Sequence, residues 1–135
     1  KKPLQEGRFL KRYKRFFTDI EFQGQTLVAH TANTGSLKGV AIPGQPCLFS
    51  ESDNPERKLK HSLEMIQAPT GAWVGVNTSI PNTITKEALE KAKAGEGFSF
   101  WSGFDQIKPE FKLNAETRID FALFSEKKTK LIEVK

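Results

Sequence analysis

Hydrophobic positions in the first 75 residues come in short runs that polar turns interrupt, a pattern typical of β-strands. The runs are "RFLKRYKRFFTDIEF", "TLVAH", "VAI" and "CLFS", and the turns between them are "QGQ", "NTGS" and "PG". Beyond the loop "ESDNPERK", the segments "LKHSLEMIQAP" and "GAWVGVNTS" continue the pattern. About five short strands with glycine and proline between them predict a small barrel or sandwich over residues 1–75.

The pattern changes after "IPNT", where helix-forming residues begin. Thr85 is the predicted N-cap, "KEALEKAKAG" supplies strong helix formers, and Gly95 marks the predicted end of the helix. The segments "FDQIKPEFKLN", "TRIDFALFS" and "TKLIEVK" then predict three strands. Residues 76–135 are therefore expected to form a second domain, in which one helix precedes the strands.

The last two predicted strands each carry an acid. Side chains alternate between the two faces of a strand, so the side chain of Asp120 lies on one face and those of Ile119 and Phe121 lie on the other. If residues 125–128 form a four-residue hairpin loop, Phe124 pairs with Thr129 and Asp120 lies directly across from Glu133. Their Cβ atoms would then be about 4.5–5.5 Å apart.

Two facing carboxylates are destabilising unless a positive charge lies between them. Lysine and arginine could supply that charge, and so could Mg²⁺ or Mn²⁺, since hard cations take carboxylates together with waters and phosphate oxygens. Asp120 on one strand and Glu133-x-Lys135 on the next suit metal-assisted phosphodiester hydrolysis, with both acids on the metal and the lysine near the reacting water. The alternative is a cross-strand ion-pair patch. A register shifted by one residue would place the two acids on opposite faces.

Charge is distributed unevenly along the chain. The net charge is +5, and eleven Lys/Arg against six Asp/Glu in residues 1–60 carry the excess, because residues 61–135 hold ten of each. In "RFLKRYKRFF", cations alternate with rings, the usual composition of a surface that binds single-stranded nucleic acid. We expect most phenylalanines to be core residues and Tyr13 to be the ring best suited to stacking. A merely solvated basic face is the alternative. The candidate nucleic-acid contacts in this segment are Arg12, Tyr13, Lys14 and Arg15.

Further candidate phosphate contacts follow in two loops. In "NTGS", Asn33, Thr34 and Ser36 could present N–H and hydroxyl groups to a phosphate, or could only complete a tight turn. Arg57 and Lys58 could contact phosphate or remain a solvated pair. Asn77, Thr78 and Asn82 are expected to make capping and turn hydrogen bonds.

Other chemistry has little support in the sequence. Cys47 excludes an internal disulfide and a cysteine-based zinc site, and its neighbours favour a small core residue. His30 and His61 have no metal-binding spacing, and no glycine-rich nucleotide loop occurs. Apolar stretches are too short to span a membrane, so a soluble cytoplasmic protein is expected.

Several motifs in order resemble the sugar fermentation stimulation protein A family. They are "RYKRFF", "HTANTGSLKGV", "LFSESDNPERKLKHSLEMI", "VGVNTSIPN", and "RIDF" with "EVK". The resemblance implies an α+β protein, with an OB-fold-like barrel followed by a PD-(D/E)xK nuclease-like domain. It also implies sequence-non-specific DNA binding and a suggested regulatory role in sugar metabolism. The metal-site pattern of that nuclease class maps onto Asp120, Glu133 and Lys135. Glu87 and Glu110 are additional acids, each more suited to a solvated surface.

Two functions are therefore expected, and they differ in chemistry. One is a DNA-binding protein whose second domain is a nuclease-like, Mg²⁺- or Mn²⁺-dependent phosphodiesterase. The other is a purely regulatory DNA-binding module without catalysis, and RNA is an alternative ligand for either. The resemblance further implies that the chain stops before the nuclease-like domain is complete. Nothing in the sequence predicts an oligomeric state.

Overall fold

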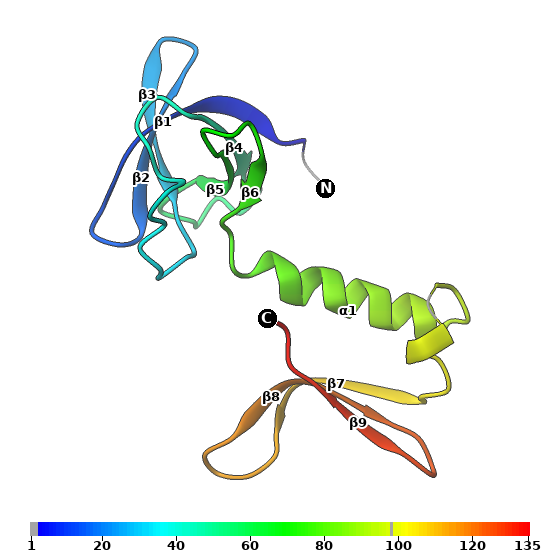
Figure 1. The fold of residues 1–135 in the computed structure, drawn as a ribbon. Helices are drawn as coiled ribbons and strands as arrows, with labels where there is room; N and C mark the ends of the chain where they lie inside the picture. The colour runs from blue at the N-terminus through cyan, green and yellow to red at the C-terminus, as the bar shows by residue number, and fades with distance from the viewer. Residues whose placement is uncertain (1–2, 98) are drawn as a thin grey trace. The chain divides into compact units, whose positions relative to one another are not determined.

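A computed structural model describes residues 3–97 and 99–135. The chain forms two compact units, Lys1–Thr78 and Ser79–Lys135 (Figure 1). Within the described residues, no helix combines the length and the apolar character that crossing a membrane requires.

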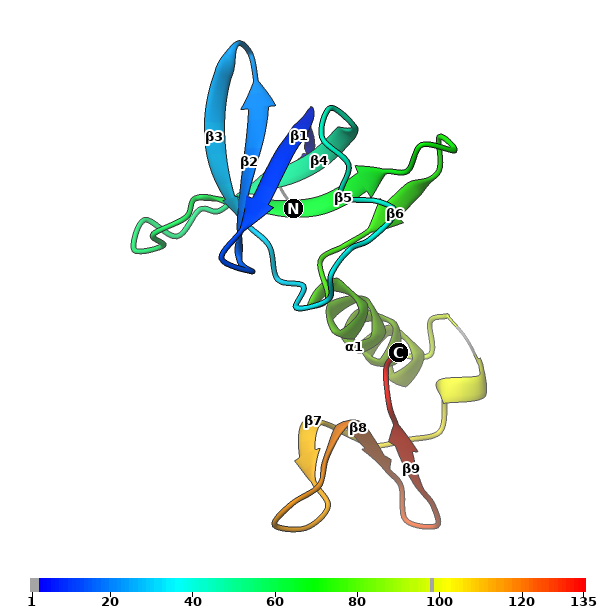
Figure 2. The ribbon, with the colours of Figure 1, turned by 60° about the vertical axis from the view of Figure 1, so that its left-hand side comes forward.

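The first unit is a closed β-barrel of the predicted OB-like class (Figure 2). Its sheet has the order β3-β2-β1-β4-β5-β6, and a parallel pairing of β3 with β5 closes the first five strands into a barrel. The strands are β1 (Gln5–Tyr13), β2 (Phe17–Phe22), β3 (Gln25–His30), β4 (Pro46–Glu51), β5 (His61–Gln67) and β6 (Trp73–Gly75).

Alternation of side chains fills the barrel. In β2, Thr18 and Ile20 are fully buried while their neighbours are only half-buried, so the strand turns one face inward. Cys47 is fully buried, as predicted for a small core residue, and desolvation raises the pKa of its thiol to about 12. The remaining buried apolar residues of this core are Phe9, Ala29, Phe49, Leu63, Ile66 and Val76.

Strand β1 pairs with β4 over its first residues and with β2 over its last ones, and a glycine is required where the pairing changes. Gln5–Arg8 pairs with β4 and Arg8–Tyr13 with β2, with a bulge between Phe9 and Lys11. A Cβ atom on Gly7 would lie 2.6 Å from Ile20 Cγ2 and 2.8 Å from the Glu21 carbonyl oxygen. Because one of these neighbours is backbone, no side chain fits where the pairing of β1 changes from β4 to β2.

Two strand predictions are wrong. Residues 8–22, expected as one strand, form the β1–β2 hairpin, because Lys14 and Arg15 take positive φ angles of 48° and 64° without a glycine or proline to signal the turn. The segment "VAI" lies in the long connection between β3 and β4 and not in a strand.

The second unit packs a helix on a three-stranded sheet (Figure 1). The elements are α1 (Ile80–Lys93), the 3₁₀ turn η1 (Ser99–Trp101), β7 (Gln106–Lys112), β8 (Arg118–Phe124) and β9 (Thr129–Ile132). Leu89 of α1 packs with Phe104 and with the sheet residues Phe121 and Leu123.

The helix begins earlier than predicted. Its N-cap position is Ser79 and not Thr85, and a proline follows in the first turn, where its missing N–H costs nothing. The predicted end is confirmed, since Gly95 has a φ of 83° and the Glu96 N–H donates to the Lys91 carbonyl at 2.8 Å. The last strand is shorter than expected and ends at Ile132.

The close approach at Gly7 predicts a strong response to a single methyl group. Gly7→Ala should lower the free energy of unfolding by about 1–3 kcal/mol, because a Cβ there overlaps the backbone of β2. Urea unfolding of the full-length protein measures this change. Gly75→Ala is the matched control, since a Cβ at that strand glycine meets nothing within 4 Å. Equal effects of the two substitutions would contradict the role of Gly7 in closing the barrel.

Candidate nucleic-acid surface and acid pair

The turn between β1 and β2 carries two cations on strained backbone. Lys14 and Arg15 both occupy the left-handed region, where hairpin turns usually have asparagine or glycine. Both side chains are exposed, and neither forms an ion pair within the described part of the chain. Keeping large charged residues in this conformation costs about 1–3 kcal/mol each, a cost that is concentrated at functional sites.

Arg12 organises the loops around this turn. Its guanidinium donates to the carbonyl oxygens of Arg15 at 2.7 Å, of Gly35, and of Asn33. Its strand partner is the buried Thr18, so its side chain lies at the end of the barrel interior. Arg12 was predicted to contact DNA, and the structure places it as a clamp between the β1–β2 turn and the "NTGS" segment.

Those two segments border one depression of about 600 Å³. The predicted residues that line it are Arg12, Tyr13, Lys14, Arg15, Thr34 and Ser36. Lys11, not predicted, adds a fourth cation, and it also pairs with Asp19 at 3.5 Å. Alternation along β1 could have identified Lys11, because it lies two positions before Tyr13 and so on the same face.

The "NTGS" segment is a tight turn, which was one of its two predicted roles. The Asn33 side-chain oxygen accepts the Gly35 N–H at 2.7 Å. Asn33 therefore shapes the turn, whereas Thr34 and Ser36 are exposed and their hydroxyls make no hydrogen bond to another described residue. These two hydroxyls face the depression with the cations.

Aromatic rings lie next to the turn. Tyr13 stacks on Phe17 at 5.6 Å between ring centroids, and its hydroxyl donates to Asp19 at 3.0 Å. This hydrogen bond to the carboxylate, together with desolvation, raises the pKa of Tyr13. Most phenylalanines were expected in the core, yet Phe16 is 42% exposed and stacks on His30. Phe16 is therefore a second accessible ring, and residue order alone could not separate it from Phe17.

The Arg57–Lys58 pair lies in the loop between β4 and β5 and opens neither a strand nor a helix. Arg57 donates to the Ser62 hydroxyl at 2.7 Å, and Ser62 pairs with His30 where the barrel closes. Lys58 is exposed. Arg57 is therefore held beside the strand that carries His30.

In the second unit, the predicted hairpin register is confirmed. Phe124 pairs with Thr129, and the Ser125 N–H donates to the Lys128 carbonyl at 2.9 Å to close the four-residue loop. The pairing ends at Phe121 with Ile132, one position before Asp120 and Glu133. The cross-strand pairing of Asp120 with Glu133 therefore lies beyond the paired residues and stays a prediction.

Asp120 is held by two donors. Its carboxylate accepts the Val134 N–H at 2.8 Å and the Asn82 side-chain amide at 3.0 Å. The Val134 hydrogen bond is the main reason why the pKa of Asp120 lies below its usual value, with further lowering by Asn82 and by a hydrogen bond with the Glu133 carboxyl. Glu133 is itself exposed. Asn82, expected to cap or turn the chain, instead positions Asp120, and only the folded helix–sheet packing reveals it.

The other charged residues of this region have separate partners. Lys135 is exposed. Arg118 pairs with Glu110 at 3.3 Å, and Glu87 pairs with Lys91 at 3.2 Å along the helix. Neither of the two additional acids joins Asp120. Of the residues described, no three histidine, cysteine, aspartate or glutamate side chains gather into a group able to hold a metal ion.

Each of the two units matches a known protein family. Residues 10–76 match the family described as the SfsA N-terminal OB domain, and residues 79–135 match the sugar fermentation stimulation protein RE domain. The chain belongs to the sugar fermentation stimulation protein family. A homologue from Bdellovibrio bacteriovorus is 62% identical over 98% of this chain, and one from Geotalea uraniireducens is 40% identical over the same share.

The chain spans a little over half of these relatives, 57% and 56% of their lengths. A solved structure described as Pyrococcus furiosus SfsA in complex with Ca²⁺ has the same fold, with a TM-score of 0.81. It is 22% identical and is matched over 98% of this chain and 54% of that one.

The contacts of Asp120 predict an acid-sensitive contribution to stability. Because its folded pKa lies below its unfolded value, the contribution is present above about pH 4 and is lost as the pH falls through the folded pKa. Asp120→Asn should remove this part of the pH dependence, measured by urea unfolding of the full-length protein between about pH 3 and pH 7. Asp105→Asn, at an exposed position, is the control and should keep the wild-type profile. An identical acid profile in Asp120→Asn would contradict the assignment.

Proposed function

We propose that this protein binds DNA without sequence specificity, through the barrel surface formed by the β1–β2 turn and the "NTGS" segment. The observation that carries the proposal is the convergence of three cations, Lys11, Lys14 and Arg15, on one depression at one end of the barrel, whose loops Arg12 connects. Two of them, Lys14 and Arg15, are exposed on strained backbone and have no ion-pair partner among the residues that the structure describes, as expected if phosphates are their partners. The OB-fold class commonly binds nucleic acid near this turn.

Polar and aromatic groups around the cations extend this surface. Thr34 and Ser36 offer hydroxyls to phosphate oxygens, and Phe16 and Tyr13 offer ring faces beside them. Contacts to phosphates and to the faces of bases carry no sequence information, which favours binding without sequence specificity. A regulatory role in sugar metabolism would then depend on where the protein is recruited.

Replacing the turn cations should weaken binding in a salt-dependent way. In Lys14→Gln with Arg15→Gln, the slope of log affinity against log salt should fall by up to about 0.9 per lost phosphate contact on duplex DNA. Fluorescence anisotropy of the full-length protein over a salt series measures the slope. The control is Lys86→Gln with Lys91→Gln, which removes the same charge from lysines already paired with Glu90 and Glu87. A slope unchanged by the turn variant would place the DNA interface elsewhere, and tighter binding to RNA would reassign the ligand.

We expect Arg12 to support DNA binding by holding the two loops in position, and not by contacting phosphate with its charge. Arg12→Lys keeps the charge but cannot make the three carbonyl contacts, so it should weaken DNA binding about as much as Arg12→Gln. Both should leave the salt slope close to that of the wild type. If Arg12→Lys binds DNA like the wild type, Arg12 contacts phosphate directly, as the sequence alone suggested.

We further propose that Asp120 and Glu133 hold Mg²⁺ or Mn²⁺. The donor set fits a hard cation, because Asp120 is kept ionised and Glu133 lies against it, and such ions accept one or two carboxylates with waters and phosphate oxygens. The Ca²⁺ named for the Pyrococcus furiosus structure supports a divalent site in this fold. A bound metal would polarise a phosphodiester and activate water. Asn82 and Val134 orient Asp120, and Lys135 can stabilise developing negative charge.

Metal binding separates the nuclease-like function from a purely regulatory one. Asp120→Asn and Glu133→Gln should each lower the affinity of the full-length protein for Mn²⁺ by at least about tenfold, measured by calorimetry. Glu87→Gln, whose carboxylate pairs with Lys91, is the control and should bind Mn²⁺ like the wild type. Unchanged binding in both acid variants would leave Asp120 a structural group, and DNA binding without cleavage would then be the whole function.

A further inference from the structure

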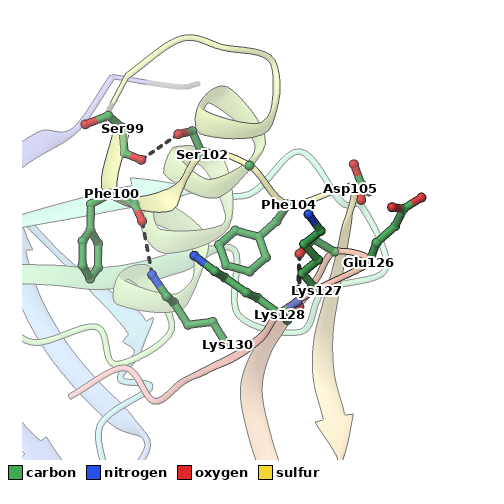
Figure 3. Close-up of a pocket in the computed structure, with 11 residues that line it drawn as sticks. Ser99, Phe100, Ser102, Phe104, Asp105, Glu126, Lys127, Lys128 and Lys130 are labelled. Carbon is green, nitrogen blue, oxygen red and sulfur yellow. Dashed lines mark hydrogen bonds between the residues drawn. The ribbon is translucent and has the colours of Figure 1, made fainter.

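A depression in the second unit combines an exposed ring with lysines (Figure 3). It has a volume of about 670 Å³ and lies between the η1 turn with the residues that follow it and the β8–β9 hairpin loop. Along β8, this hairpin loop is five residues from Asp120, which corresponds to about 16 Å of strand. The depression is therefore distinct from the acid pair.

Phe100 is the most exposed of the large hydrophobic side chains that the structure describes, at 72%. The Lys130 ammonium lies 3.9 Å from the centre of its ring and donates to the Phe100 carbonyl at 3.2 Å. The same ammonium lies 5.4 Å from the Phe104 ring. Lys130 thus holds Phe100 in place through its ring and its carbonyl, and most of the phenylalanine side chain remains open to solvent. A ring that is both held in place and exposed contributes little to the core and is suited to stacking on a ligand.

Both lysines and acids line the depression. Lys127 and Lys128 are exposed in the hairpin loop and form no ion pair among the residues the structure describes. Figure 3 shows the carboxylates of Asp105 and Glu126 beside one another, on the side away from Phe100. A phosphate is therefore repelled from the acid side and attracted to the lysines, while the acids can accept hydrogen bonds from base amino groups.

We propose that this depression binds single-stranded nucleic acid, with an unpaired base on Phe100 and the adjoining phosphates on Lys127 and Lys128. The inference rests on the proposed DNA binding and adds to it a second contact surface, together with a preference for unpaired bases. Only a base outside a duplex offers its face to a side chain, so Phe100 contributes to single-strand binding alone. The lysines contribute the salt-dependent part.

The test uses the full-length protein with fluorescent oligo(dT) and with a duplex of the same length. Phe100→Ala and Phe100→Leu should weaken oligo(dT) binding about 5- to 150-fold, the loss expected for one stacked base, and leave duplex binding unchanged. Phe100→Trp should retain oligo(dT) binding. Circular dichroism confirms folding, and Phe100→Leu keeps an apolar side chain so that a packing effect is separated from the loss of the ring.

The lysines are tested by salt dependence. Lys127→Gln with Lys128→Gln should reduce the oligo(dT) salt slope by about 1.4, or about 0.7 for each phosphate contact. The control is again Lys86→Gln with Lys91→Gln, which should keep the wild-type slope. Equal losses of oligo(dT) and duplex binding in Phe100→Ala would overturn the stacking assignment.

The two proposals fail in different ways. If oligo(dT) binding is lost in the Lys14→Gln, Arg15→Gln variant but unchanged in all Phe100 and hairpin variants, the inference is overturned and the barrel surface stands. If the wild type binds neither DNA at any salt concentration, the proposed function itself is overturned.

Discussion

Backbone contact at Gly7 is the constraint on which the barrel depends. One strand must pair with β4 at its beginning and with β2 at its end, and it can do so only where a missing side chain lets the two backbones meet. Closure then follows from the pairing of β3 with β5, which leaves no free edge among the five barrel strands. The loops at one end are thereby brought together, and the "NTGS" segment comes to lie beside the β1–β2 turn.

Within that end of the barrel, the cations have different tasks. Arg12 uses its planar group to bind loop carbonyls, whereas the side chains of Lys14 and Arg15 are exposed on strained backbone. A guanidinium can hold two loops because its donors are fixed in one plane, which a lysine cannot imitate. The clamp therefore sets the shape of the surface, and the turn cations give it charge.

In the second unit, too, some residues hold a charged side chain in place and others remain exposed. Asn82 of the helix and the Val134 N–H fix Asp120, while Glu133 stays exposed beside it. The ionised state of Asp120 is thus a product of hydrogen bonding more than of a neighbouring cation. The exposed ring at Phe100 lies at the other end of the same hairpin, so the strands β8 and β9 join two separate surfaces.

The sequence alone determined the strands with clear alternation, the hairpin between Phe124 and Thr129, and the end of the helix at Gly95, because these depend on local period and turn chemistry. It also indicated which segments hold the cations and the acids. Only the tertiary structure decided the turn at Lys14 and Arg15, the exposure of Phe16, the clamp by Arg12 and the support of Asp120 by Asn82. Each of these features depends on groups that are distant along the chain, or on backbone strain that only surrounding packing can maintain. Long-range contacts and backbone strain leave no periodic signal in the sequence.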